Sequence, residues 1–186
     1  MQKARVAPNC LRRFAVQDFA IRCLQKTKGE KMEKIASFTI DHLKLERGLY
    51  VSRKDEQNGV TVTTFDLRMT VPNKEPVMDN PALHTVEHLG ATFLRNCANK
   101  NQVVYFGPMG CRTGFYLVMF GNLQSDDVFA LVQEMCNFVL QFQGDVPGAT
   151  PSECGNFSEQ NLAMAKWYVA RYLDDLQRHK RFQYPV

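Results

Sequence analysis

Two histidines one helical turn apart are the residues of this 186-residue chain best suited to chemistry, in the order His84-Thr85-Val86-Glu87-His88. Residues i and i+4 lie on one face of an α-helix, so both imidazoles can bind one divalent ion. Imidazole nitrogen suits zinc, iron, nickel and cobalt. Glu87 adjoins the second histidine and can act as a base beside the ion without binding it. The order H-x-x-E-H is that of the inverted zincins.

A third protein ligand is expected, because a catalytic metal site keeps one coordination position open. We assign this place to Cys154, in a loop before the last predicted helix. Its neighbour Gly155 lets the backbone approach the ion closely. The alternative for His84 and His88 is that they cap or pack on a helix surface. The apolar residues around the pair indicate a partly buried face, which favours the metal site.

The six cysteines show no C-x-x-C pair and no regular spacing, which indicates reduced thiols in a cytoplasmic protein. Cys111 follows a Gly-Pro-Met-Gly turn at the start of a predicted strand, so its thiol can face a cavity. The alternative is that Cys111 is a small buried hydrophobe. Cys97 and Cys136 fall within predicted helices, and we assign them to packing.

Hydrophobic periodicity predicts an α+β fold, an antiparallel sheet packed with three to four helices. The first long helix carries the metal site. Asn58-Gly59 predicts a hairpin turn, a change of phase near residues 63–64 predicts a β-bulge, and Asn80 before Pro81 predicts a helix N-cap. The predicted extended segments are residues 35–45, 48–53, 60–71, 102–106 and 112–120, and the predicted helices are residues 80–98, 125–142 and 158–177.

Charge and composition divide the chain near residue 31. Residues 1–31 hold eight basic and two acidic side chains, whereas residues 32–186 hold fifteen and seventeen. The folded body therefore has no basic excess that would favour nucleic acid. We interpret residues 1–31 as a disordered or non-native extension, although this basic segment is somewhat like a transit peptide, and Met32 is a candidate start.

Residues 32–186 then form a single catalytic domain. No apolar run approaches the roughly 20 residues of a membrane span, and the N-terminal segment lacks the apolar core of a secretory signal. We therefore expect a soluble cytoplasmic protein with no membrane partner.

Several motifs, taken together and in order, resemble the S-ribosylhomocysteine lyase (LuxS) family over about residues 32–176. The stretches that carry the resemblance are residues 37–42 (SFTIDH), 65–68 (FDLR), 72–74 (PNK), 84–89 (HTVEHL), Arg95, 107–116 (GPMGCRTGFY) and 153–155 (ECG).

The resemblance implies cleavage of S-ribosyl-L-homocysteine to L-homocysteine and 4,5-dihydroxy-2,3-pentanedione. The second product is the precursor of the quorum-sensing signal autoinducer-2, and the first belongs to the activated methyl cycle and methionine metabolism. The resemblance also implies a homodimer with active sites at the subunit interface. It implies one divalent ion per subunit, ferrous iron first, with Zn(II) or Co(II) able to take its place.

The roles of further residues follow from the same resemblance. Glu87 and Cys111 would move protons during carbonyl migration and β-elimination. The implied substrate contacts are Ser37, His42, Arg68 and Arg95. Arg95 would grip the substrate carboxylate, since a guanidinium binds carboxylate in bidentate fashion. Many members carry an acid before the Pro-Met-Gly-Cys turn, but residues 103–107 hold none.

Two other functions fit parts of the pattern. A metallopeptidase of the inverted zincin type also uses H-x-x-E-H, but its third ligand is usually a carboxylate and Cys111 has no role in it. A structural or regulatory metal-binding module would close the fourth coordination position, and removal of the metal would then unfold it.

Overall fold

A computed structural model of the chain describes residues 34–35 and 38–185. The chain divides into two units, Met1–Lys34 and Ile35–Val186, and the second unit contains the sheet and the helices of the described residues. The predicted extension at residues 1–31 lies outside the described residues, so the domain boundary at residue 32 stays a prediction.

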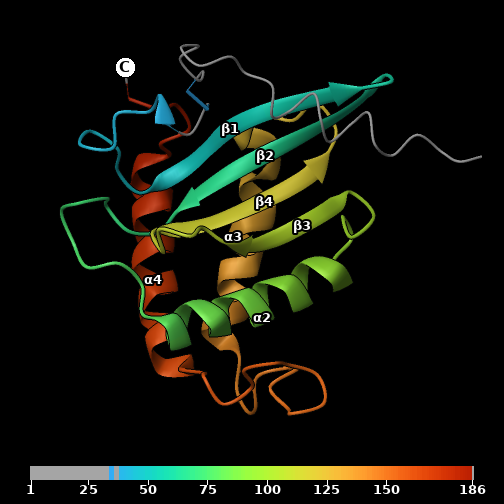
Figure 1. Cartoon of the computed structure of the whole chain (residues 1–186), viewed down its shortest axis with the longest axis vertical. Helices are drawn as coiled ribbons and strands as arrows, with labels where there is room; N and C mark the ends of the chain where they lie inside the picture. The colour runs from blue at the N-terminus through green and yellow to red at the C-terminus, as the bar shows by residue number, and fades with distance from the viewer. Residues whose placement is uncertain (1–33, 36–37, 186) are drawn as a thin grey trace, which may run out of the picture. The chain divides into compact units, whose positions relative to one another are not determined.

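The second unit holds one antiparallel sheet of four strands in the order β1-β2-β4-β3. The strands are β1 (Gly48–Gln57), β2 (Val60–Arg68), β3 (Val103–Pro108) and β4 (Gly114–Phe120), and the helices are α2 (Asn80–Asn96), α3 (Ser125–Gln141) and α4 (Leu162–His179). This order of elements confirms the predicted α+β fold (Figure 1). None of the described helices is both long and apolar enough to cross a membrane.

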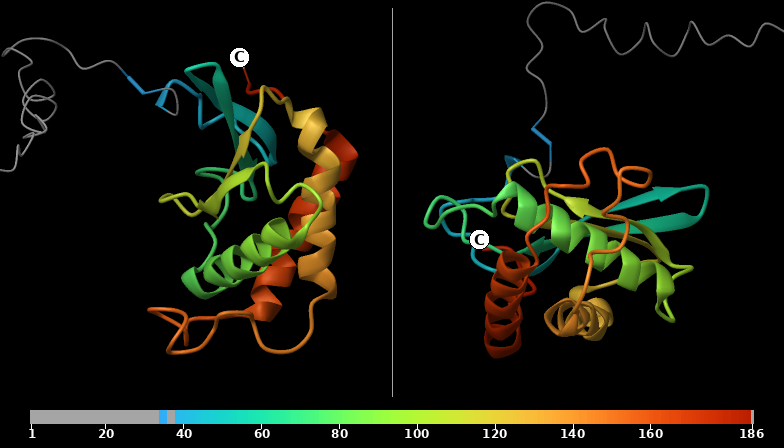
Figure 2. Two further views of the ribbon diagram at one scale, coloured as in Figure 1. Left: turned by 90° about the vertical axis from the view of Figure 1, so that its right-hand side faces the viewer. Right: turned by 90° about the horizontal axis from the view of Figure 1, so that it is seen from below.

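Within the described residues, α2, α3 and α4 lie on one face of the sheet, and no helix of this part of the chain covers the other face (Figure 2). Between the layers sits one hydrophobic core, which β2 and β4 supply with Phe65, Leu67, Phe115 and Leu117 from the helix-facing side. Successive strand residues alternate between faces, so Asp66, Arg68 and Tyr116 point to the side without helices. The sheet therefore separates the core from the polar residues on its open face.

The hairpin between β1 and β2 confirms the predicted turn, since Asn58 and Gly59 have φ of 54° and 77°. A register shift does interrupt the β1–β2 pairing beside Thr64, but its extra residue lies in β1 between Val51 and Arg53 and not in β2, where the bulge was predicted. The pairing of β2 with β4 runs without a break. The hydrophobic pattern changes phase because Val60 and Val62 lie on the same open face as Asp66 and Arg68, whereas Phe65 and Leu67 face the core.

The predicted extended segment 35–45 is wrong for the part that the structure describes, which folds into turns. The Asp41 carbonyl accepts hydrogen bonds from the backbone N–H groups of Lys44 and Leu45, each at 3.1 Å. The Asp41 carboxylate accepts the N–H of Leu43 at 2.9 Å. A short acidic side chain offers the backbone this local partner in place of a sheet ladder.

Helix boundaries differ from their predictions where a side chain caps the helix. The carboxylate of Asp79, not the amide of Asn80, caps α2 by accepting the N–H of Ala82 at 3.0 Å. The same helix ends at Asn96, two residues before the predicted end. For α4, Asn161 is the cap, so this helix begins at Leu162 and not near residue 158. Glu159 and Gln160 are therefore outside the helix, and both contact side chains of α2.

Replacement of Asp79 by alanine tests the cap of α2. We expect Asp79→Ala to lower the free energy of unfolding by about 1 kcal/mol, because an N–H at the start of the helix loses its acceptor. Urea denaturation followed by circular dichroism measures this change. Asn80→Ala is the matched control and should change it by less than about 0.5 kcal/mol, because the Asn80 amide bonds only the exposed Arg112. A larger cost for Asn80→Ala than for Asp79→Ala would contradict this assignment.

Candidate active site

The donor atoms of His84, His88 and Cys154 converge, although the cysteine lies 70 residues from the first histidine. The two Nε2 atoms are 3.0 Å apart, and Sγ of Cys154 lies 3.5 Å from Nε2 of His84. All three donor atoms lie within 4.8 Å of one another, and all three residues are partly buried. The predicted ligands are thus brought together, and these three residues, which could hold one metal ion, are called the metal cluster.

Backbone carbonyls fix how the two imidazoles present their nitrogens. Nδ1 of His84 lies 3.0 Å from the Glu159 carbonyl, and Nδ1 of His88 lies 2.7 Å from the Pro147 carbonyl. A carbonyl only accepts, so each Nδ1 carries the proton and each Nε2 presents a lone pair. Two lone pairs that face each other at 3.0 Å repel, unless a cation lies between them.

The spacing of these donors fits one bound ion. Metal–nitrogen bonds of about 2.0–2.1 Å and a metal–sulfur bond of about 2.3 Å, arranged tetrahedrally, separate two nitrogens by about 3.3 Å and nitrogen from sulfur by about 3.6 Å. The cluster shows 3.0 Å and 3.5 Å for these two separations. Three protein ligands leave one position open, as a catalytic site requires.

The long loop between α3 and α4 supplies the carbonyls and the thiol. Gly148 has a φ of +74°, and a Cβ added there would lie 3.2 Å from Nδ1 of His88, so a side chain would strain the loop beside its histidine. The Asn156 N–H donates to Sγ of Cys154 at 3.4 Å. The Thr85 hydroxyl joins the end of the loop to α2, since it donates to the amide oxygen of Gln160 at 2.7 Å.

Glu87 lies on α2 between the two histidines and is partly buried. Its carboxylate makes no hydrogen bond or ion pair with the other residues that the structure describes. An unpaired carboxylate next to a metal ligand can accept a proton, which is the role predicted for Glu87.

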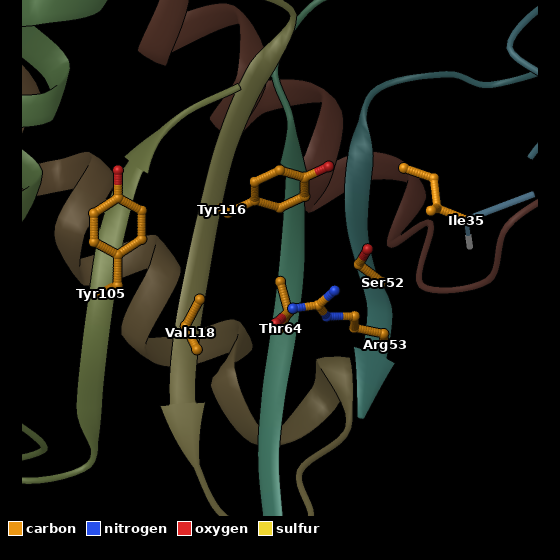
Figure 3. Close-up of a pocket in the computed structure, with 7 residues that line it drawn as sticks. All are labelled: Ile35, Ser52, Arg53, Thr64, Tyr105, Tyr116 and Val118. Carbon is orange, nitrogen blue, oxygen red and sulfur yellow. The ribbon is translucent and has the colours of Figure 1, made fainter. Parts of the chain in front are cut away.

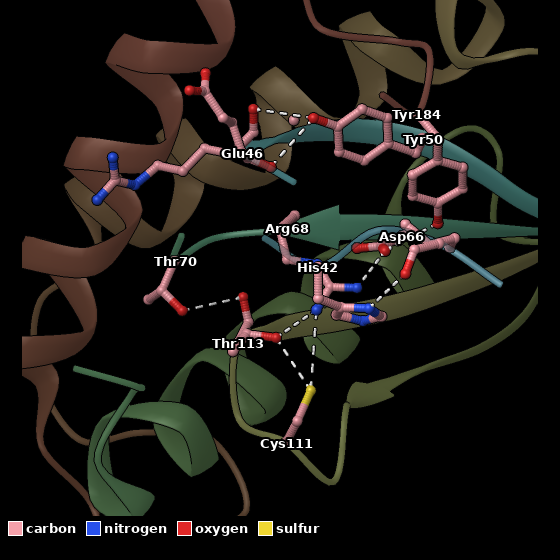
Figure 4. Close-up of polar contacts among 12 residues, drawn as sticks. His42, Glu46, Tyr50, Asp66, Arg68, Thr70, Cys111, Thr113 and Tyr184 are labelled. Atoms are coloured by element: carbon pink, nitrogen blue, oxygen red, sulfur yellow. Dashed lines mark hydrogen bonds and ion pairs between the residues drawn. The ribbon is translucent and has the colours of Figure 1, made fainter. Parts of the chain in front are cut away.

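A second polar cluster, the thiol pocket, lies on the open face of the sheet. This pocket of about 260 Å³ is lined by His42, Asp66, Arg68, Cys111 and Tyr184 among others. Nη1 of Arg68 lies 3.9 Å from Sγ of Cys111, and its Nη2 lies 2.5 Å from Oδ2 of Asp66. Figure 4 shows Arg68 between Asp66 and Cys111, with Thr113 alongside.

The surroundings of Cys111 favour its thiolate. Partial burial raises the pKa of the thiol, but hydrogen bonds from the hydroxyl and the backbone of Thr113 and the charge of Arg68 outweigh it. The pKa of Cys111 is therefore lowered. Arg68 is charged like any arginine near neutral pH; burial lowers its pKa, but the neighbouring Asp66 carboxylate outweighs this and raises it. A thiol of lowered pKa suits proton transfer near neutral pH.

Asp66, Thr113 and Tyr184 belong to this cluster but were not predicted as functional residues. The sequence offered a signal for Asp66, because it stands two residues before Arg68 in a strand and so shares its face. A carboxylate at 1% exposure is rare unless it is paired. Thr113 stands two residues after Cys111 within the motif 107–116, but nothing in that motif singled it out. Tyr184 reaches the cluster from the C-terminal segment, 118 positions from Asp66, so no local pattern marked it.

The other predicted substrate contacts have different positions. His42 lines the thiol pocket, and its Nδ1 lies 2.9 Å from the Ile40 carbonyl. Arg95 is not among the described residues that line this pocket; it donates to the carbonyls of Val103 and Val104, both at 2.8 Å. Ser37 lies outside the described residues. The substrate roles of all these residues stay predictions.

The sequence profile of the S-ribosylhomocysteinase (LuxS) family matches residues 35–183. The chain belongs to this family. Membership confirms the resemblance drawn from the motifs, and the matched stretch contains both the metal cluster and Cys111.

Curated relatives agree with this assignment along nearly their whole length. S-ribosylhomocysteine lyase of Phocaeicola vulgatus is 56% identical over 149 residues, which are 80% of this chain and 92% of the relative. The protein of the same name from Finegoldia magna is 52% identical over 150 residues, 81% of this chain and 96% of the relative. That of Borreliella afzelii is 50% identical over 159 residues, 83% of this chain and the whole of the relative.

Cobalt loading tests the ligands of the LuxS metal cluster without reference to activity. We expect the purified chain to bind about one equivalent of Co(II) and to show a thiolate-to-metal absorption band, because Cys154 supplies sulfur. Cys154→Ser should lose the band, and His84→Ala should lose most of the metal, as measured by optical spectroscopy and elemental analysis. The matched control is His179→Gln at the end of α4. A band that survives in Cys154→Ser rules out this ligand.

Proposed function

We propose that this chain is an S-ribosylhomocysteine lyase, which cleaves S-ribosyl-L-homocysteine to L-homocysteine and 4,5-dihydroxy-2,3-pentanedione. One observation carries the proposal: a two-histidine, one-thiolate donor set with an open position occurs in a member of the LuxS family. The names of the relatives support the same reaction. The products would supply an autoinducer-2 precursor and return homocysteine to methionine metabolism.

The reaction requires acidic C–H bonds beside a carbonyl. The thioether can leave by β-elimination only after the sugar carbonyl has moved along the ribose chain, and each move takes a proton from one carbon and returns it to the next. A divalent ion at His84, His88 and Cys154 would supply Lewis acidity to a sugar oxygen. The reaction needs no external oxidant or reductant. In the elimination the electron pair of the broken C–H bond becomes the new C=C bond, and the electron pair of the broken C–S bond leaves with the homocysteine sulfur, which then takes up a proton.

Cys111 and Glu87 are the proposed proton carriers. A lowered pKa lets the Cys111 thiolate take a carbon-bound proton and the thiol return it near neutral pH. The unpaired Glu87 carboxylate, next to a metal ligand, would exchange protons with the sugar hydroxyls and give a proton to the leaving sulfur. Thr113 and Arg68 support this cycle because they stabilise the charged form of Cys111.

Four residues are proposed to contact the substrate. Arg68 and His42 line the thiol pocket, which supports a role in holding the sugar. Ser37 is proposed from the family motif alone. Arg95 would bind the substrate carboxylate, although both Nη groups already donate hydrogen bonds to backbone carbonyls of β3. A guanidinium carries five N–H donors, so some remain for the substrate.

Ferrous iron is the proposed ion, with Zn(II) or Co(II) able to replace it, because two imidazoles and one thiolate accept all three. We also propose a cytoplasmic location. The described cysteines, Cys97, Cys111, Cys136 and Cys154, are free thiols, which fits a reducing compartment.

A homodimer is proposed, with the open face of the sheet as its interface. Side chains from all four strands line a shallow pocket there, among them Tyr105, Tyr116 and Val118 (Figure 3). Tyr105 is 50% exposed and Phe120 is 47% exposed, and such aromatic surface is enriched in protein interfaces.

The separation of the two clusters also supports a dimer. The lining of the thiol pocket includes none of the metal ligands and not Glu87. Glu87 and Cys111 must nevertheless act on one substrate. We propose that each active site joins the metal cluster of one protomer to the thiol pocket of its partner.

Release of homocysteine tests the reaction. Iron-loaded protein should release one thiol per S-ribosylhomocysteine, followed with a thiol reagent, and metal-stripped protein should release none. Cys111→Ser and Glu87→Gln should each lower kcat by at least about 100-fold, the usual share of an acid or base. Cys97→Ser, a partly buried cysteine on the helical side, should keep wild-type kcat. Peptide cleavage without thiol release would favour a metallopeptidase and reject the lyase.

Mixed dimers test the shared active site. Glu87→Gln and Cys111→Ser subunits, coexpressed with different tags, should together recover about a quarter of wild-type activity. Half of the dimers are then mixed, and each mixed dimer holds one intact site of two. Tandem affinity purification isolates them for assay. If both residues acted within one subunit, every site would carry a defect and the mixed dimers would stay inactive.

A further inference from the structure

The segment that follows α4 turns back to the open face of the sheet. Lys180 ends the helix with a φ of 44°, and its N–H donates to the Leu176 carbonyl at 3.0 Å. The carbonyl of Arg181 then accepts the N–H of Leu49 at 3.0 Å. The Arg181 side chain bonds Glu46 at 2.7 Å and also contacts Asp175. These contacts fix the route of the chain toward β1.

Tyr184 lies at the end of this route and enters the thiol pocket. Its ring stacks on Tyr50 with centroids 4.7 Å apart and planes 16° apart. Its hydroxyl donates to Oδ2 of Asp66 at 2.9 Å. Figure 4 shows the two tyrosine rings beside each other, with Asp66 and Arg68 next to them. Tyr184 lies one residue beyond the stretch that the family profile matches.

We propose that Tyr184 is a positioning residue of the lyase: its hydroxyl holds the Asp66 carboxylate, which in turn holds the Arg68 guanidinium beside Cys111. This inference rests on the proposed function for the reaction that the pocket serves. It assigns to the C-terminal segment a part in the active site that the motifs do not contain.

Tyr184 can affect Arg68 because of how Asp66 and Arg68 are hydrogen-bonded. Oδ2 of Asp66 accepts from both Tyr184 and Arg68, whereas Oδ1 has no hydrogen-bond partner, and neither has Nε of Arg68. A carboxylate held through one oxygen can rotate about that contact. The tyrosine hydroxyl supplies the second direction that fixes the carboxylate. Without it, Arg68 can shift between Asp66, Thr113 and Cys111.

The ionisable groups around Asp66 set the sign of the expected pH effect. Arg68 from β2 is the cation that faces it, the His42 imidazole comes from the segment before β1, and Tyr184 donates to it. The phenols of Tyr50 and Tyr116 lie nearby. Burial raises the pKa of Asp66, while Arg68, Tyr184 and His42 lower it.

Loss of the Tyr184 hydroxyl therefore raises the pKa of Asp66 further. A neutral Asp66 no longer holds Arg68 as an ion pair. The acid limb of kcat/KM, where activity falls as the pH drops, should then lie at higher pH.

Tyr184→Phe tests the proposal, since the ring and its stack on Tyr50 remain. We expect kcat to fall about tenfold, as for one lost hydrogen bond to a charged group, with KM changed less than twofold. The acid limb of kcat/KM should move to higher pH, and the Tm should stay close to that of wild type. Unchanged kcat with an unmoved acid limb would overturn the proposal.

Tyr50→Phe is the matched control from the same stacked pair. The Tyr50 hydroxyl donates only to the backbone carbonyls of Glu46 and Arg47, at 3.1 and 3.4 Å. This variant should keep the wild-type kcat and acid limb, whatever its Tm. Equal kinetic losses in both variants would mean that the stack has a structural role alone, which also rejects the proposal.

Titration of the Asp66 carboxyl by carbon-13 NMR separates this inference from the proposed function. Tyr184→Phe should raise the pKa of Asp66 relative to wild type, whether or not the substrate is correct. If wild-type protein releases no thiol from S-ribosylhomocysteine, the proposed function fails, and a raised pKa still supports the link from Tyr184 to Asp66. An unchanged pKa of Asp66 would refute that link directly.

Discussion

The buried ion pair of Asp66 and Arg68 is the interaction on which the open face of the sheet depends. Both side chains lie on β2, an inner strand, and are almost fully buried, with Asp66 1% and Arg68 3% exposed. A buried charge must find partners, because desolvation costs several kcal/mol per ion. Thr113, which directly precedes β4, and Tyr184 from the C-terminal segment supply these partners. These contacts join β2 to the turn that holds Cys111 and Thr113 and to the distant C-terminal segment.

In the metal cluster, too, polar side chains are held by partners from a distant segment, and here the partners are backbone carbonyls. Two backbone carbonyls of the α3–α4 loop accept the Nδ1 protons of His84 and His88. These contacts orient the rings, select the tautomer and hold the loop that carries Cys154. The helix supplies rigid spacing, and the loop supplies the backbone acceptors, so neither element would form the cluster alone. Glycine at position 148 permits the close approach.

The features that were predicted correctly from the sequence are those that depend on residues close together in the chain. The histidine pair follows from helical spacing, and the hairpin follows from the tolerance of Asn58 and Gly59 for positive φ. Cys154 needed the family motifs, because six cysteines were candidates by residue type. The cap at Asp79, the bulge in β1 and the contact of Tyr184 with Asp66 were not predicted. Each depends on a competing neighbour or a partner strand, or on a residue 118 positions away, which local patterns do not encode.

Stability alone does not explain why a charged pair lies in this sheet. Apolar side chains of similar volume in place of a buried ion pair often leave a protein equally or more stable. Such a replacement on β2 would remove the cation beside Cys111 and the charge that Tyr184 orients. Arg68 lowers the pKa of Cys111 only while its guanidinium lies beside the thiol, and Asp66 holds it there. The pair is therefore best understood as a cost in folding free energy that the chemistry of the thiol requires.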